Sequence, residues 1–483
     1  MDSATQVHST RTDVPLCVDL DGTLIRTDVL VEGYIRCVKR NVWYAVLSLF
    51  WLLRGIANLK AQVARNAVLD VALFPVNADF HAWLLEQHGN GRRLILCTAA
   101  NEAIAGLVAR RFGIFESTIA SDSTTNLSGA RKAHLLEKLF GPSGFDYAGN
   151  EAKDIEVWRR ARHAIVVSPT ARLRRRIADV PRVQKIFPNP NRRSVSAWVR
   201  ALRLHQWIKN LLIFVPALAA HKASDPAVIS SAVLAFVWFG LCASATYVIN
   251  DLLDLEADRA HAHKRLRPFA SGEIPIVNGA AGALMLLTAG IAGSILTING
   301  LFVLVLLTYV IWTLWYSLML KRIAMVDVLS LAGLYTVRVI AGGAAVLIVP
   351  SFWLLAFSMF LFLSLAMAKR YTELRAALSS GKLEAAGRGY LTDDLSLLLS
   401  FGASSGLMSV LVLALYMNGG TGQLYRHPEA LWMLCPMLLY WICRIWRKAY
   451  RGELHHDPVV FAVQDRPSLA VGCVCVALVW AAI

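Results

Sequence analysis

The sequence is poor in charged residues. Only 17% of its 483 residues are Asp, Glu, Lys or Arg, whereas 56% are apolar and the mean hydropathy is +0.49. Soluble domains carry about 25% charged and about 45–50% apolar residues, so the shortage excludes a wholly soluble protein. The deficit is uneven, because residues 1–200 have mixed polarity while long apolar blocks fill 207–483. We therefore predict two parts that face different solvents.

The eight cysteines include no C-x-x-C pair, which argues against a zinc site or a disulfide framework and for a reducing compartment. Acidic residues are also few: 33 Asp and Glu stand against 49 Lys and Arg, a formal charge of +16. No nucleic-acid-binding motif accompanies the excess, so we expect no nucleic acid as partner and assign the charge to loops at a membrane. The polar first residues, MDSATQVHST, predict no signal peptide.

The apolar blocks predict nine membrane spans, since a helix needs roughly 20 apolar residues to cross the hydrocarbon core. The predicted spans are 207–220, 229–249, 277–297, 300–319, 326–349, 352–368, 399–417, 428–443 and 468–483.

The loops between these spans differ in charge. With the N-terminal part placed in the cytoplasm, the inner loops hold sixteen Lys and Arg and the outer loops hold Lys222 and Arg426. Cytoplasmic loops accumulate Lys and Arg, so this asymmetry predicts a bacterial-type inner (plasma) membrane protein with every long polar loop inside.

Two carboxylates follow the first apolar run of the polar part, LCVDLDGTL at 16–24. Asp19 and Asp21 stand two residues apart at the end of a predicted strand and therefore point the same way. Such a pair suits one carboxylate as nucleophile and the other as acid or base, with Mg²⁺ between them. Three further cues follow in order: Thr98 at the end of LILCT, Lys132 in ARKAHLL, and Asn150 and Asp154 in YAGNEAKD.

In this order and spacing the four stretches resemble the haloacid dehalogenase-like (HAD) phosphohydrolases over about 13–170. The resemblance implies a Rossmann-like α/β domain over 1–170 with Asp19 as phosphorylated nucleophile and Asp21 as general acid or base. It implies that Thr98 and Lys132 hold phosphoryl oxygens and that Asp19, Asp21, Asn150 and Asp154 form the Mg²⁺ site. Asn150 stands where the family usually has Asp, which removes one charge and leaves an inactive, regulatory domain as the alternative.

A long insert at about 25–92 separates the first motif from the second, and in this family such an insert forms a cap over the site. It contains VWYAVLSLFWLL at 42–53, which is too short to span a membrane readily. A buried cap helix and a membrane-surface helix that docks a lipid substrate both fit this run. A basic linker and membrane-surface helix at 171–202 then leads to the apolar part at 203–483.

Carboxylates cluster after the second apolar span, in NDLLDLEADRAHAHKRLRP. Asn250, Asp254 and Asp258 recur at i, i+4 and i+8, and Asp251 lies two turns before Asp258, so all are predicted on one side of a helix. Ionisable groups near a membrane helix end are expensive unless they pair or bind ions, so the array indicates a functional site, and carboxylates suit Mg²⁺ bridged to substrate phosphates. The phosphate-binding cations that follow are Lys264, Arg265 and Arg267.

This array followed by KRxRP resembles the UbiA superfamily of intramembrane prenyltransferases, over about 200–483. The stretches RLHQWIKNLLIFVPALAA, DRAHAHKRLRPFASGEIP, YTVRVIAGG and AKRYTEL are similar to its decaprenyl-phosphate phosphoribosyltransferase branch. The resemblance implies an all-α, nine-helix transmembrane bundle with Mg²⁺ held by Asp251, Asp254 and Asp258. Its further candidate substrate-binding residues are Lys209, Tyr316, Lys321, Asp327, Arg338, Lys369, Arg370 and Tyr371.

The fusion suggests two successive reactions. The transferase would move 5-phosphoribose from phosphoribosyl diphosphate to a polyprenyl phosphate, and the HAD-like domain would remove the 5-phosphate. The alternatives are aromatic prenylation of an acceptor such as 4-hydroxybenzoate, with a regulatory HAD-like domain, and a non-enzymatic transporter or scaffold. The expected partners are the lipid, the sugar donor and the membrane, and the oligomeric state stays open, a homo-oligomer included.

Overall fold

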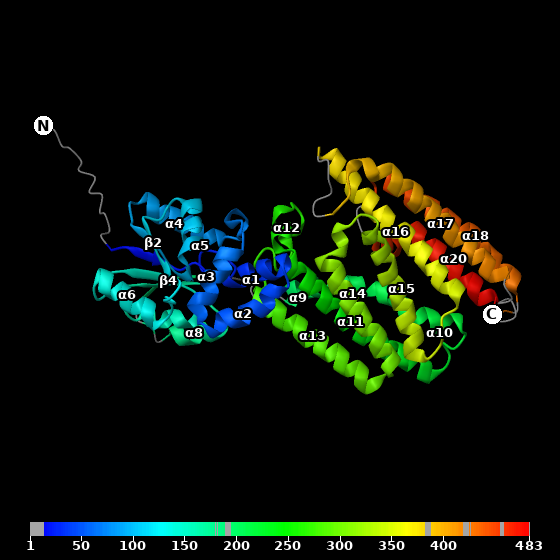
Figure 1. Ribbon diagram of the computed structural model, residues 1–483, viewed down its shortest axis with the longest axis horizontal. Coiled ribbons are helices and arrows are strands. Elements are labelled where there is room, and N and C mark those ends of the chain that lie inside the picture. Colours follow the sequence, from blue (N-terminus) through cyan, green and yellow to red (C-terminus); the bar gives the residue numbers. More distant parts are fainter. Residues whose placement is uncertain are drawn as a thin grey trace. The chain divides into compact units, whose positions relative to one another are not determined.

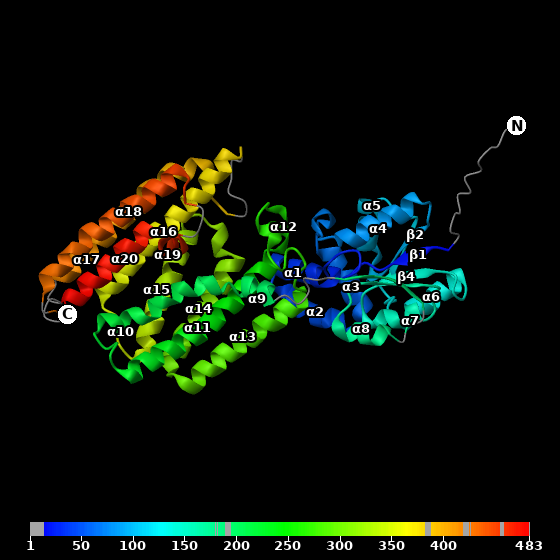
Figure 2. The ribbon, with the colours of Figure 1, turned by 180° about the vertical axis from the view of Figure 1, so that it is seen from behind.

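The structure is a computed structural model, shown from opposite sides in Figures 1 and 2, that describes residues 14–178, 180, 182–188, 195–381, 388–418, 425, 427–454 and 458–482. Contacts within the chain divide it into two compact units. The first comprises Met1–Ala201 and Asp251–Ala281, and the second comprises Leu202–Asn250 and Gly282–Ile483. The loop that carries the aspartate array therefore belongs to the first unit, together with the α/β part.

A six-stranded parallel sheet forms the centre of the first unit, with the strand order β3-β2-β1-β4-β5-β6. Because the order reverses at β1, the residues that follow β1 lie where such sheets bind ligands. The strands are β1 (Leu16–Val18), β2 (Leu94–Asn101), β3 (Ser117–Ser121), β4 (Asp146–Gly149), β5 (Ala164–Val167) and β6 (Val183–Phe187).

Helices cover both faces of this sheet, because alternate strand residues point to opposite sides. Leu16 and Val18 pack into one apolar core and Cys17 into another. In Figures 1 and 2, α4 (Ala78–Gly89) and α5 (Glu102–Phe112) lie on one face, and α6 (Ala130–Phe140), α7 (Ile155–Trp158, labelled in Figure 2) and α8 (Ala171–Ile177) lie on the other. The predicted Rossmann-like α/β fold is confirmed, and the stretch predicted as a basic linker contributes α8 and the edge strand β6.

The segment between β1 and β2 is helical. It contains α1 (Val29–Arg40), α2 (Trp43–Leu53), α3 (Ile56–Asn66), the short 3₁₀ helix η1 (Val71–Leu73) and α4. Asp28 caps α1, because its side chain accepts a hydrogen bond from the Val31 N–H. Gly55, with φ of 103°, makes the turn between α2 and α3.

In the described part of the chain, six helices are long and apolar enough to cross a membrane. They are α11 (Pro226–Leu253), α13 (Ile276–Thr297), α14 (Gly300–Leu318), α15 (Val326–Val346), α16 (Phe352–Ser379) and α17 (Leu395–Asn418). In the second unit, α15 is buried along most of its length and packs against α14 and α16. Helices α16 and α17 run side by side in both views.

The predicted count of nine spans is therefore confirmed only for six among the described residues, or seven if one bent pair is a single span. The first predicted span is a 3₁₀ helix, η3 (Leu204–Phe214), followed by the short α10 (Val215–Ala219). The eighth is η8 (Pro428–Met433) joined to α18 (Leu434–Arg451), whose last turns carry Arg444, Arg447 and Lys448. The ninth, α20 (Arg466–Ala482), bends by 83° from α19 (Pro458–Gln464).

Candidate functional site

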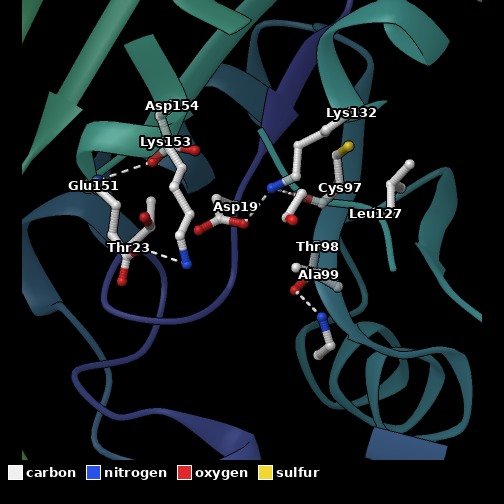
Figure 3. Close-up of polar contacts among 12 residues, drawn as sticks. Asp19, Thr23, Cys97, Thr98, Ala99, Leu127, Lys132, Glu151, Lys153 and Asp154 are labelled. Atoms are coloured by element: carbon white, nitrogen blue, oxygen red, sulfur yellow. Dashed lines mark hydrogen bonds and ion pairs between the residues drawn. The ribbon is translucent and has the colours of Figure 1, made fainter. Parts of the chain in front are cut away.

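The predicted phosphatase residues meet at the carboxyl edge of the sheet (Figure 3). Asp19 directly follows β1, and Lys132 reaches it from α6. The Lys132 Nζ lies 2.8 Å from Asp19 Oδ1, 2.8 Å from the Tyr147 hydroxyl and 3.3 Å from the Cys97 carbonyl oxygen. Thr98 lies fully buried in β2, where its Oγ1 accepts a hydrogen bond from the Ala100 N–H at 3.0 Å.

Burial sets the protonation of both predicted catalytic carboxyls. It raises the pKa of Asp19 to about 6, although the Lys132 ammonium opposes the shift. Burial and the charge of Asp28 raise the pKa of Asp21 well above its usual range, against the hydrogen bond that Asp21 Oδ1 accepts from the Val29 N–H at 2.9 Å. With a pKa of about 6, Asp19 is mostly ionised at neutral pH, whereas Asp21 keeps its proton to a higher pH than an exposed carboxyl does.

Asn150 and Asp154 lie next to this pair. Asn150 Oδ1 accepts a hydrogen bond from the Thr23 hydroxyl at 3.2 Å. Its Nδ2 would lie 2.1 Å from a Cβ at Gly22, so only glycine fits at that position, where φ is 71°. Asp154 Oδ2 accepts hydrogen bonds from the backbone N–H groups of Asn150 and Glu151, both at 2.9 Å. These contacts hold the loop after β4 against the loop after β1.

Two further residues, Tyr147 and Lys60, belong to the site although none of the predicted motifs includes them. The Tyr147 hydroxyl donates to Asp154 Oδ1 at 3.0 Å and accepts from Lys132, so it links the two predicted motifs. Lys60 of α3 donates to the Ala99 carbonyl at 2.6 Å and to Asn126 Oδ1 at 2.8 Å. Tyr147 could have been found from its place in the last strand before Asn150, whereas Lys60 lies in the insert, where no motif marks it.

The aspartate array does not lie on one continuous helix. Helix α11 ends at Leu253, and α12 (Leu255–Ala260) begins after Asp254, whose side chain makes no capping hydrogen bond to α12. Lys39 of α1 stabilises this break, because its Nζ donates to the Leu253 carbonyl at 2.7 Å and to Asp254 Oδ1 at 3.1 Å. A carbonyl at a helix end needs such a donor. The expectation that all the carboxylates line one side of a single helix is thus corrected.

Arg267 brings two of the array's carboxylates together. Its Nη1 lies 3.1 Å from Asp251 Oδ1 and 2.7 Å from Asp258 Oδ2, and both aspartates are almost completely buried. Burial raises the pKa of Asp258, although Arg267 opposes the shift. Lys264 and Arg265, in the 3₁₀ turn η4 (Lys264–Leu266), are exposed. The pair Asp251 and Asp258 is therefore within reach of a single cation.

The second unit contains its own charged cluster around Asp327, which is fully buried at the start of α15. Asp327 accepts hydrogen bonds from the Tyr316 hydroxyl at 2.8 Å and from Arg370 Nη2 at 3.0 Å, and Arg370 Nε also pairs with it. Arg388 lies 3.3 Å from Asp327, and Glu373 accepts from Arg370 at 2.6 Å. The structure thus joins three predicted residues, Tyr316, Asp327 and Arg370, across α14, α15 and α16.

Arg338 occupies a separate buried position in α15. Its Nε donates to Asn210 Oδ1 and its Nη2 to the Tyr309 hydroxyl, each at 3.0 Å. Its guanidinium carbon lies 4.9 Å from the Tyr309 ring centroid, within cation–π range. A charge buried this far inside a membrane helix is expensive unless it is paired, and these polar contacts and aromatic rings offset that cost.

The remaining predicted residues lie at several places in the second unit. The Lys209 ammonium is 5.3 Å from the Tyr335 ring centroid, and Lys321 Nζ lies 3.4 Å from Asn250 Oδ1. Tyr371 packs in an apolar core, with its ring 6.1 Å from that of Trp446, and Lys369 is half-buried.

Neither predicted metal site gathers three acidic, histidine or cysteine ligands within the described residues. Both predicted sites nevertheless offer oxygen ligands. The site in the α/β part has Asp19 and the Asn150 amide oxygen, and the site after α11 has Asp251 and Asp258. The guanidinium that bridges Asp251 and Asp258 shows that this pair accepts a cation. Hard oxygen ligands of this kind fit Mg²⁺, which takes one or two carboxylates and completes its shell with water and substrate phosphate.

The doubly wound sheet with Asp19, Thr98 and Lys132 at its carboxyl edge fits the HAD-like domain that the motifs predict. The six long apolar helices among the described residues indicate a multi-pass membrane protein. The sequence model of the UbiA prenyltransferase family matches residues 211–464. The chain belongs to the UbiA prenyltransferase family, and the predicted resemblance is confirmed.

Two relatives extend this similarity. The uncharacterized protein y4nM of Sinorhizobium fredii is 35% identical over 461 residues, which cover 95% of this chain and 89% of that protein. The decaprenyl-phosphate phosphoribosyltransferase of Mycobacterium tuberculosis (strain CDC 1551) is 37% identical over 203 residues, which cover 41% of this chain and 67% of that enzyme. Among solved structures, a UbiA homolog from Archaeoglobus fulgidus bound to GPP and Mg²⁺ aligns with a TM-score of 0.45 and 17% identity over 59% of this chain and 99% of that one.

Proposed function

We propose that the chain transfers 5-phosphoribose from phosphoribosyl diphosphate to a polyprenyl phosphate, and that its HAD-like domain then removes the 5-phosphate. The observation that carries the transferase step is the buried pair Asp251 and Asp258 held by Arg267, at the end of a membrane helix. The similarity to a relative named decaprenyl-phosphate phosphoribosyltransferase supports this donor and acceptor.

In the transferase step, Asp251 and Asp258 would hold Mg²⁺, and Asp254 lies between them in the sequence. When bound, the ion neutralises the pyrophosphate leaving group. Arg267 is placed to turn from the two carboxylates to a phosphate oxygen, which a guanidinium binds with two parallel hydrogen bonds. The lipid phosphate is already ionised, so its oxygen attacks the anomeric carbon without a strong general base.

In the second step the ionised Asp19 carboxylate attacks the phosphorus of the 5-phosphate, and the bond to the ribose oxygen breaks. Asp21, whose pKa is raised by burial, donates the proton that the leaving ribose hydroxyl needs. Lys132 and Thr98 stabilise the phosphoryl oxygens. Water then releases phosphate from Asp19, and Asp21 takes up the proton of that water.

The excess of Lys and Arg in alternate loops supports a cytoplasmic position for the HAD-like domain and the aspartate array in a bacterial-type inner membrane. In that arrangement both steps occur on the same side of the membrane.

The deciding experiment incubates the purified chain in liposomes with Mg²⁺, polyprenyl phosphate and labelled phosphoribosyl diphosphate, and examines the lipid extract by mass spectrometry. We expect a polyprenyl-phosphoryl ribose without a 5-phosphate. The family description names prenyl transfer, which supports the second candidate, a UbiA-type transfer of a prenyl group, for which the sequence analysis named an aromatic acceptor. Labelled prenyl diphosphate with 4-hydroxybenzoate tests it, and a prenylated ring without any ribosylated lipid would replace the first proposal.

A further inference from the structure

Helix α2 exposes an unusually apolar surface. Its sequence is WYAVLSLFWLL, and Ser48 is its one buried residue. The exposed fractions are 70% for Trp43, 62% for Leu49, 60% for Phe50 and 84% for Leu53. Single exposed apolar side chains are common on proteins, but a contiguous apolar helix face marks an interaction site.

One narrow side of α2 is packed against its neighbours. The Tyr44 and Trp51 rings lie 5.8 Å apart, and the Tyr44 hydroxyl donates to Asn66 Oδ1 of α3 at 3.1 Å. Both aromatic residues pack against the buried cluster of Cys37 and Val63. Tyr44, Ser48 and Trp51 are spaced at i, i+4 and i+7, so they form one stripe, and the rest of the helix surface faces outward.

The charges around α2 have one sign. Between Glu32 and Asp70 the sequence contains no acidic residue and six basic ones: Arg36, Lys39, Arg40, Arg54, Lys60 and Arg65. Arg40 and Arg54 lie just before and just after α2, and both are exposed. An apolar helix with a cation at each end complements the anionic surface of a membrane, because each cation near such a surface adds attraction.

The length of α2 decides how it can lie. Eleven residues span about 16 Å as an α-helix, roughly half the thickness of the hydrocarbon core. The helix is too short to cross the membrane, whereas six other helices among the described residues are long enough to do so. Because these helices anchor the chain in the bilayer, any other surface of the chain that can bind lipid meets the bilayer at a high effective concentration.

We infer that α2 is an in-plane membrane helix, which inserts its exposed apolar face between the acyl chains and headgroups of the bilayer that holds the long helices. Arg40 and Arg54 then contact anionic headgroups at its two ends. This inference selects the second of the two alternatives that the sequence left open for residues 42–53.

The inference has a consequence for the HAD-like site, which rests on the proposed phosphatase function. Gly55 turns the chain from α2 directly into α3, and Lys60 of α3 donates to the carbonyl of Ala99, next to the predicted phosphate ligand Thr98. The helical pair α2–α3 therefore connects the lipid-binding face with the catalytic edge of the sheet. The substrate class that fits is a phosphate carried on a lipid, whose headgroup stays at the membrane surface.

The first test uses the full chain in liposomes of phosphatidylcholine and phosphatidylglycerol that contain a phosphatidylcholine with a photoreactive acyl chain. After illumination, proteolysis and mass spectrometry map the labelled residues. We expect label on Trp43–Leu53 as well as on α13 and α14, and none on α4, where Leu85 is also exposed. An unlabelled α2 in the presence of labelled α13 and α14 would overturn the inference, including the case in which a second copy of the chain covers α2.

The second test compares Phe50→Glu with the matched control Leu85→Glu, which places the same charge on an exposed apolar position of α4. Phe50→Glu should reduce α2 labelling several-fold and lower dephosphorylation of the phosphoribosylated lipid about tenfold, while hydrolysis of soluble ribose 5-phosphate stays unchanged. Leu85→Glu should change neither rate. An equal loss of hydrolysis rate on the lipid and on soluble ribose 5-phosphate would contradict the lipid role of α2. If the unmodified chain has no phosphatase activity at all, the proposed phosphatase function is rejected, and the labelling experiment alone decides the position of α2.

Discussion

Glu32 and Arg259 form a buried ion pair that joins α1 to α12. Arg259 Nη1 lies 2.8 Å from Glu32 Oε2 and Nη2 lies 2.6 Å from Oε1, and only 6% and 7% of the two side chains are exposed. Arg259 Nε also donates to the Ala270 carbonyl at 2.9 Å. One guanidinium thus joins α1, the helix that follows the Asp19–Asp21 loop, to the loop that carries the aspartate array, and every one of these contacts lies inside the first unit.

Removal of one partner of this pair should be costly. Glu32→Ala leaves Arg259 buried without its carboxylate, and such a loss typically costs about 3–5 kcal/mol of unfolding free energy. We expect a lower unfolding temperature of the purified chain in detergent, measured by scanning fluorimetry. The double variant Glu32→Met with Arg259→Leu should regain most of the loss, because it leaves no unpaired charge. If Glu32→Ala and the unmodified chain had the same unfolding temperature, the ion pair would contribute little to stability.

Replacement of the nucleophile should separate the two proposed reactions. Asp19→Asn removes the attacking carboxylate but leaves Asp251 and Asp258 untouched, so the 5-phosphorylated lipid should accumulate while its rate of formation is unchanged. Mass spectrometry of the lipid extract measures both. Asp79→Asn, on the exposed side of α4, is the matched control and should behave like the unmodified chain. Complete dephosphorylation by Asp19→Asn would exclude Asp19 as the nucleophile.

The phosphatase step should lose activity on the acid side. Asp19 attacks only when ionised, and its pKa is about 6, so kcat/KM should fall as the pH drops through that value. Lys132 holds this pKa down, hence Lys132→Met should move the acidic limb to higher pH as well as lower the maximum. The pH profile with soluble ribose 5-phosphate measures the shift. An acidic limb that does not move would show that another group controls it.

The transferase step should depend on the pair that Arg267 holds. Asp251→Asn and Asp258→Asn should each lower transfer by about 10²-fold or more, since each removes a charge that would hold Mg²⁺ beside the leaving group. Glu429→Gln, on an exposed residue of η8, should leave transfer intact. Chelation with EDTA should stop transfer and added Mg²⁺ should restore it. Transfer that persists in EDTA would contradict the metal-dependent step.

The cluster around Asp327 should need the geometry of arginine. Arg370 pairs with Asp327 and Glu373 at once, which a single lysine ammonium cannot reproduce. Arg370→Lys should therefore lower the unfolding temperature and the transferase rate, and Lys448→Arg, which keeps the charge on α18, should change neither. Retention of full activity by Arg370→Lys would show that charge alone suffices at this position.

The sequence could predict those site residues whose position follows from the residues next to them in the chain. Asp19 follows a short apolar strand and Thr98 lies in another, and parallel strands bring their carboxyl ends to one edge, so their meeting was predictable. The break at Asp254 was not, because it depends on Lys39, which lies 215 residues away in the sequence. The role of Lys60 was not predictable for the same reason, because its partner Ala99 lies 39 residues later, in β2.

The sequence by itself determined the division into an α/β part and a membrane part, the candidate site after β1 and six of the apolar spans, because hydrophobic runs and strand periodicity are local properties. Tertiary structure alone decided which carboxylates share a cation, which helix ends are capped by distant lysines and which side of α2 faces outward. These outcomes depend on long-range packing and on the pairing of buried charges, which no local pattern of residues records.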